Sequence, residues 1–197
     1  MSGITDPSSS DTTGMHPELT AEDVAYVRST FCTQSDLDRQ RAAAGLAPQA
    51  SYLLPDGTPM VATEPDADLA QTTDPLDLRQ RFHTRWVAAG GRHQDADAEL
   101  EAWLRGGYGV CLRSPCPETI LAKTALAQTI AALTTRPMPQ RAWWRETLRH
   151  AVAAYDELVL PFASVDPARF GGTTSRAQLI DTVRAQWPEL SPTHRRD

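Results

Sequence analysis

The chain of 197 residues lacks the features that mark several large classes of protein. It contains no run of 18 apolar residues, so we expect no membrane-spanning helix. Its first residues include neither a basic leader nor an apolar segment, and we expect a cytoplasmic protein rather than a secreted one. The net charge of -6 and the pI near 5.3 argue against a general nucleic-acid or membrane-surface binder.

Reactive and metal-binding motifs are also scarce. The three cysteines, Cys32, Cys111 and Cys116, show no CxxC spacing, and their odd number predicts reduced thiols. Cys111 lies in an apolar run typical of a core residue, while the roles of Cys111 and Cys116 stay open. The five histidines show no metal-ligand spacing, and no glycine-rich phosphate-binding motif occurs. We therefore expect neither a metal nor another cofactor.

The N-terminal part of the chain predicts a small module between two irregular stretches. Residues 1–18 are rich in Ser, Thr, Asp and Pro, which is typical of a disordered tail. Within 19–62, Thr20 and Asp23 form a capping-box pattern at the start of one helix. We expect a second helix over about 35–44 and a hairpin whose turn contains Asp56-Gly57, followed by a linker over 63–74.

The remainder of the chain, 75–190, predicts a helical domain. With hydrophobic content at 41%, the chain can form a sizeable core. Apolar periodicity, prolines and a Gly-Gly pair divide this part into expected helices near 75–89, 96–105, 117–134, 140–160 and 175–187. The predicted fold class is mainly α: a helical bundle with a small N-terminal helix-helix-hairpin module.

Three charged side chains fall on or beside the apolar stripes of these helices. Lys123, the only lysine of the chain, lies on the stripe of its helix, Asp156 borders another, and Arg176 lies on a third. Isolated buried charges are costly, so each should find a partner or shift its pKa. One interpretation is an ion pair of Lys123 or Arg176 with Asp156 that serves only the core. The other is a polar pocket in which Asp156 acts as a base and Lys123 assists catalysis.

Further polar residues favour an anion site in the C-terminal half. Arg113, Arg169 and Arg176 lie at loop–helix junctions, and the segment 171–176 presents a Gly-Gly pair and hydroxyls, including that of Ser175, at a helix start. Tyr108 is a candidate second proton-transfer group, although its glycine neighbours equally indicate a buried corner residue.

Several longer strings resemble a known family. They are Trp103-Leu-Arg-Gly-Gly-Tyr-Gly-Val-Cys-Leu-Arg113, Pro117-Glu-Thr-Ile-Leu-Ala-Lys123, Asp156-Glu-Leu-Val-Leu-Pro-Phe162, and Asp166-Pro-Ala-Arg-Phe-Gly-Gly172 with Ser175-Arg176. Together they are similar to an actinobacterial family of natural-product biosynthesis proteins, over about residues 100–187 and more loosely 20–62. The size and context also resemble the aziridine-forming proteins of azinomycin-like pathways.

This resemblance implies a cofactor-free enzyme of antibiotic biosynthesis that closes a ring or eliminates a group on an anionic, amino-acid-like intermediate. In such a reaction Asp156 would take a proton from the attacking amine, while Arg113, Arg169, Arg176 and Lys123 would stabilise departing sulfate. The substrate would be a small molecule or bound to a carrier protein, and a protein partner or homodimer is left open.

Two other functions remain. A non-catalytic helper subunit fits the lack of a strong nucleophile motif and the tryptophan pair Trp143-Trp144. A regulator that uses residues 19–62 as a winged-helix-like module is disfavoured, because its basic residues are too few to hold DNA phosphates.

Overall fold

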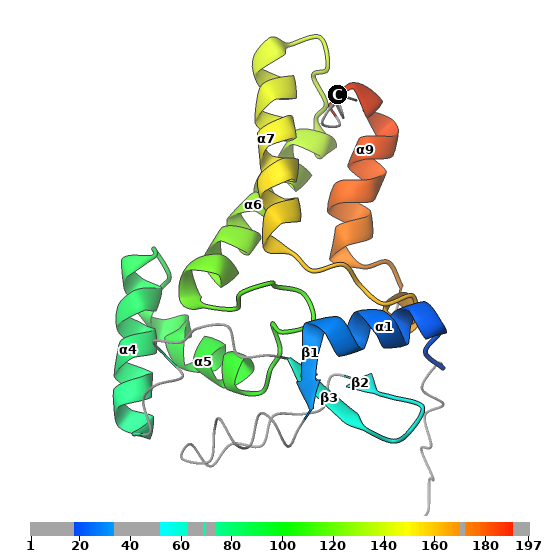
Figure 1. The fold of residues 1–197 in the computed structure, drawn as a ribbon. Helices are drawn as coiled ribbons and strands as arrows, with labels where there is room; N and C mark the ends of the chain where they lie inside the picture. Colours follow the sequence, from blue (N-terminus) through cyan, green and yellow to red (C-terminus); the bar gives the residue numbers. More distant parts are fainter. Residues whose placement is uncertain (1–17, 34–51, 63–68, 70–73, 170–171, 191–197) are drawn as a thin grey trace, which may run out of the picture.

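The computed structural model describes residues 18–33, 52–62, 69, 74–169 and 172–190. This part of the chain is mainly helical with one small sheet, which confirms the predicted fold class (Figure 1). Residues 1–17 of the expected tail, the expected second helix over 35–44 and most of the expected linker over 63–74 lie outside the described residues.

The N-terminal module consists of one helix and a three-stranded antiparallel sheet. Helix α1, Ala21–Thr30, begins with the expected capping box between Thr20 and Asp23. The sheet has the strand order β1-β3-β2, with β1 at Phe31–Thr33, β2 at Tyr52–Leu53 and β3 at Pro59–Ala62. The β2–β3 hairpin was predicted and is confirmed. Strand β1 was not predicted, because three residues directly after a helix are too short to show an alternating pattern.

Helices α4, Pro75–Ala88, and α5, Ala96–Leu104, form a pair with a short 3-10 turn, η1 at His93–Asp95, before α5. Asp74 caps α4 by accepting a hydrogen bond from the Leu76 amide, and Pro75 occupies the first turn, where its missing N–H costs nothing. Their shared core contains Phe82, Trp86 and Trp103.

Helices α6, Pro117–Thr135, and α7, Ala142–Leu158, run antiparallel, and a final helical stretch packs beside them (Figure 1). That stretch begins at Ser175 and continues through the π-helical segment η2, Ala177–Asp181, into α9, Thr182–Gln186. Two short turns, α8 at Asp166–Arg169 and η3 at Pro188–Leu190, complete the order. The core of this bundle is centred on the fully buried Trp144 and on Leu148, Tyr155 and Ile180.

The N-terminal module packs on the segment that joins α7 to α8. Ala163 and Val165 of that segment share a core cluster with Val27, Phe31 and Tyr52. Hydrogen bonds reinforce this contact, since the Tyr52 hydroxyl donates to Asp166 at 2.7 Å and the Ser164 amide donates to Asp23 at 2.6 Å. The module thereby supports the end of α7, where Asp156 lies.

In the part of the chain that the structure describes, no helix is both long and apolar enough to span a bilayer.

Candidate functional site

Two arginines of the last helix converge on Asp156 near the end of α7. Nη1 of Arg176 lies 2.6 Å from Oδ1 of Asp156, and Nη2 of Arg184 donates a hydrogen bond to Oδ2 at 2.8 Å. All three side chains are about three-quarters buried, with exposed fractions of 24%, 25% and 27% for Arg176, Asp156 and Arg184. The expected contact of Asp156 with Arg176 is therefore present, and sequence reasoning missed Arg184.

The π-helical segment explains why Arg184 was missed. In a regular α-helix, successive residues turn by about 100°, so side chains eight residues apart point about 80° away from each other. Between Arg176 and Arg184, however, the Thr182 amide donates to the Ala177 carbonyl, five residues back. This wider turn absorbs one residue, and the two arginines become equivalent to a spacing of seven, about 20° apart. Both guanidiniums can therefore reach one carboxylate.

The three groups form a cluster with more positive than negative charge. Partial burial alone would raise the pKa of Asp156, but the close contacts with Arg184 and Arg176 and their positive charges outweigh it and hold the pKa below its ordinary value. The carboxylate therefore stays ionised and is a weak proton acceptor. One negative charge faces two guanidiniums, which leaves an excess positive charge of one.

Donor groups in this cluster also lack acceptors. Nε of Arg184 is buried and has no hydrogen-bond acceptor among the described residues. The contact between Nη1 of Arg176 and Asp156 is an ion pair without hydrogen-bond geometry, so that nitrogen is likewise unsatisfied within the described part. Buried N–H groups without acceptors are rare in folded proteins, so these groups indicate that a bound acceptor is needed at the cluster.

A second arginine predicted to bind anions lies near this cluster. Burial and the charge of Asp166 raise the pKa of Tyr26 to about 12, while the charges of Arg113 and Arg176 oppose that rise. Both arginines therefore lie within electrostatic range of the Tyr26 hydroxyl, which donates to the Pro161 carbonyl. The Arg113 side chain is exposed, and its backbone amide is held by the Leu158 carbonyl at 2.9 Å.

The remaining predicted site residues are distributed differently. Lys123 lies 3.1 Å from the Cys111 sulfur, and no contact joins it to Asp156 among the described residues. The Tyr108 hydroxyl donates to Glu99, and burial together with this hydrogen bond raises the pKa of Tyr108. Ser175 begins the last helical stretch, and Arg169 ends α8, with a side chain outside the described part.

A hollow of about 590 Å³ borders the predicted anion-binding segment. It is lined by Pro167, Ala168, Gly172, Thr173, Thr174 and Ala177. The buried Thr174 hydroxyl accepts a hydrogen bond from the Ala177 amide at 3.2 Å and so caps the helix itself. The helix start is thus partly satisfied by the protein, and the arginine cluster rather than the helix end carries the unsatisfied donors.

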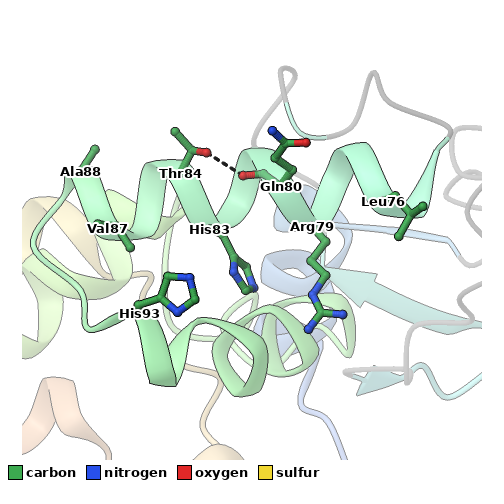
Figure 2. A pocket seen from close by; sticks show the side chains of 8 residues that line it. All are labelled: Leu76, Arg79, Gln80, His83, Thr84, Val87, Ala88 and His93. Carbon is green, nitrogen blue, oxygen red and sulfur yellow. Dashed lines mark hydrogen bonds between the residues drawn. The ribbon is translucent and has the colours of Figure 1, made fainter.

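Another hollow, of about 630 Å³, lies on the outer face of α4 (Figure 2). Arg79 and His83 line it and both contact the carboxylate of Asp97, while the His83 and His93 rings meet edge to face. The charges here are already paired within the protein. This hollow is open and has no surplus charge that would select an anion.

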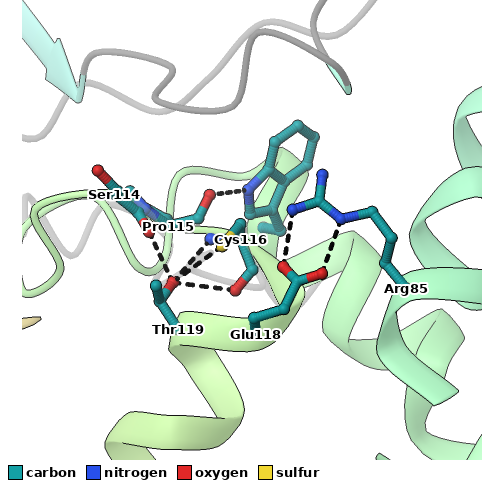
Figure 3. A network of polar contacts seen from close by, with 7 residues as sticks. Arg85, Ser114, Pro115, Cys116, Glu118 and Thr119 are labelled. Atoms are coloured by element: carbon teal, nitrogen blue, oxygen red, sulfur yellow. Dashed lines mark hydrogen bonds and ion pairs between the residues drawn. The ribbon is translucent and has the colours of Figure 1, made fainter. Parts of the chain in front are cut away.

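Arg85 offers a useful contrast with the cluster (Figure 3). Its Nε and Nη2 atoms donate to the two oxygens of Glu118 at 2.8 and 2.7 Å. These hydrogen bonds outweigh the effect of burial and lower the pKa of Glu118 to about 2. A single guanidinium holds both oxygens of Glu118, whereas two guanidiniums share the carboxylate of Asp156.

The described part of the chain shows no cluster of side chains suited to hold a metal ion. No group of three or more His, Cys, Asp or Glu side chains that could hold a metal ion occurs there.

Comparison with known proteins places the chain in a family. The model of a family of unknown function, DUF6058, matches residues 78–188, which is more than half of the chain. The chain belongs to this family. The match runs from within α4 through α9 and therefore includes Asp156, Arg176 and Arg184. No curated protein and no solved structure matches the chain.

Proposed function

We propose that this DUF6058 protein binds an anionic biosynthetic intermediate at the cluster of Asp156, Arg176 and Arg184, without a cofactor. The observation that carries the proposal is the pair of buried guanidiniums that share one carboxylate and retain N–H groups without acceptors. Guanidinium groups are the preferred partners of sulfate, phosphate and carboxylate because their N–H groups match the oxygens of these anions.

The reaction class that suits this cluster is cyclisation or elimination with loss of an anionic group, such as aziridine formation with loss of sulfate. In aziridine formation the amine nitrogen bonds to the carbon that carries sulfate, the carbon–oxygen bond breaks, and sulfate leaves with the electron pair and gains negative charge, while the nitrogen loses its proton to solvent. Two preoriented guanidiniums would stabilise that charge. Asp156 enters this proposal mainly by orienting Arg176 and Arg184, because its lowered pKa makes it a weak base.

A titration of thermal stability with sodium sulfate and with phosphate tests anion binding. A ligand that binds only the folded state stabilises it by about 2.7 kcal/mol at a hundredfold excess over Kd. We expect a saturable rise of Tm in the wild type that is lost in Arg184→Ala and Arg176→Ala. Sodium chloride at equal ionic strength is the salt control.

Arg85→Ala is the matched control variant, since the Arg85 guanidinium also binds a carboxylate but contacts both of its oxygens itself. It should lower Tm without removing the sulfate response. Equal responses in all variants, or no response in the wild type, would contradict the proposal and leave the cluster as an ion pair of the core.

A helper subunit is the second candidate, and one observation favours it. Trp143 at the start of α7 is 57% exposed, whereas its neighbour Trp144 is fully buried. Exposed tryptophan is enriched at protein interfaces. If the chain is a helper, Trp143→Ser should abolish activation of an enzyme from the same biosynthetic gene cluster while leaving Tm and the sulfate response unchanged. Retained activation in this variant would argue against the helper function.

A further inference from the structure

The only lysine of the chain contacts a cysteine. Nζ of Lys123 lies 3.1 Å from Sγ of Cys111. Every other one of the 19 Lys and Arg residues is arginine, so an amine occurs in this position and nowhere else among the side chains. An amine is a nucleophile once it loses a proton, whereas a guanidinium stays protonated.

The backbone holds these two groups together from separate segments. Lys123 lies in the first half of α6. Cys111 precedes α6, where its carbonyl accepts from the Leu160 amide at 3.1 Å and its sulfur lies 3.4 Å from the Tyr108 carbonyl. Cys111 is 9% exposed and Lys123 is half-buried, so a small oxidant is better suited than a large reagent to reach the pair.

We propose that Cys111 and Lys123 form a reversible sulfur–nitrogen bond when the protein meets hydrogen peroxide. The thiolate sulfur attacks one peroxide oxygen, the O–O bond breaks, and sulfenic acid and water form, so sulfur is oxidised and peroxide reduced. The Nζ amine then attacks that sulfur, the S–O bond breaks, and the hydroxyl group leaves as water. The proton that the ammonium group loses is taken up by the hydroxide released from peroxide, which completes the water of the first step.

The resulting sulfenamide tethers the segment before α6 to α6 itself. Sulfenic acids are known to condense with a backbone nitrogen in the same way, and here a side-chain amine is already in contact. Two molecules of a small thiol reverse the reaction. They are oxidised to a disulfide, the sulfur–nitrogen bond breaks, and the Cys111 thiol and the Lys123 amine are restored. The site is distinct from the arginine cluster and does not depend on the proposed function.

Peptide mapping of the full chain after peroxide treatment tests this bond. We expect a cross-linked species, lighter by two hydrogen atoms, that joins the peptides of Cys111 and Lys123 and disappears after dithiothreitol. An amine-acetylating reagent gives a second readout, because Lys123 and the N-terminus are the only primary amines of the chain. Labelling of Lys123 should fall after peroxide and return after reduction, while labelling of the N-terminus stays constant.

Variants identify the two partners. Cys111→Ser and Lys123→Arg should each abolish the cross-link, whereas Cys116→Ser should retain it because Cys116 contacts Thr119 rather than an amine. Conversion of wild-type Cys111 to sulfinic or sulfonic acid without a bond to Lys123 would overturn the proposal. The wild-type map alone gives this result, whether or not each variant folds.

Discussion

Asp23 and Asp156 are both largely removed from solvent, but the protein stabilises their negative charges in different ways. Asp23 is 5% exposed and accepts four hydrogen bonds, all from amide or hydroxyl groups of Thr20 and Ser164. Asp156 has two cationic partners, and nitrogen atoms of those partners lack acceptors in the described part of the chain. A satisfied carboxylate is a structural contact, whereas an unsatisfied cationic surplus favours a ligand.

Removal of the Asp23 carboxylate should give the largest loss of stability. Asp23→Ala removes the capping box of α1 and the two hydrogen bonds from Ser164. Hydrogen bonds to charged groups each contribute about 1.5–3 kcal/mol, so we expect the free energy of unfolding to fall by about 3 kcal/mol. Urea denaturation measures it. A smaller loss than that of Asp156→Asn would contradict the view that the Asp23 carboxylate is the structural contact of the two.

Low pH should remove much of the stability that the Asp23 carboxylate contributes. Burial raises the pKa of Asp23, but hydrogen bonds from Ser164 and Thr20 outweigh it and lower the pKa to about 2 from 3.8. The stabilisation is therefore fully present above pH 3.8 and is lost as the pH falls towards 2, a difference of about 2 kcal/mol. The stability gap between wild type and Asp23→Asn should narrow over that range. A gap that stays constant down to pH 2 would show that Asp23 is not the titrating group.

Asp156→Asn should destabilise the protein by less, about 1–2 kcal/mol, because solvent partly screens the two ion pairs. The same change removes the carboxylate charge that orients both guanidiniums. Sulfate should therefore stabilise the variant less than it stabilises the wild type in parallel thermal titrations. A sulfate response as strong as that of the wild type, or stronger, would show that the arginines are held in place without Asp156.

Deletion of the exposed Gln178 should have the smallest effect on the sulfate response. The π-helical segment can then relax to a regular α-helix, which leaves Arg176 and Arg184 seven residues apart and on the same face. Loss of the sulfate response in a variant that folds normally would show that the π-helical turn does more than align the arginines.

Sequence periodicity was sufficient to predict most of the helices but only two of the three residues of the arginine cluster. Asp156 and Arg176 were recognisable because each is a charge next to an apolar stripe of its own helix. Arg184 was not, since its alignment with Arg176 depends on a π-helical turn that 3.6-residue periodicity cannot reveal. The partner of Lys123 was equally hidden, because Cys111 reaches it through the path of a loop rather than through helical spacing.

The most direct measurement follows the arginine Nε–H resonances by NMR during a sulfate titration. Arg184 has a buried Nε without an acceptor in the described part, whereas Nε of Arg85 already donates to Glu118. We predict that the Arg184 signal shifts saturably, that the Arg85 signal stays in place, and that the shift disappears in Arg176→Ala. Small, linear shifts of both signals with sulfate would contradict an anion site at Asp156, Arg176 and Arg184.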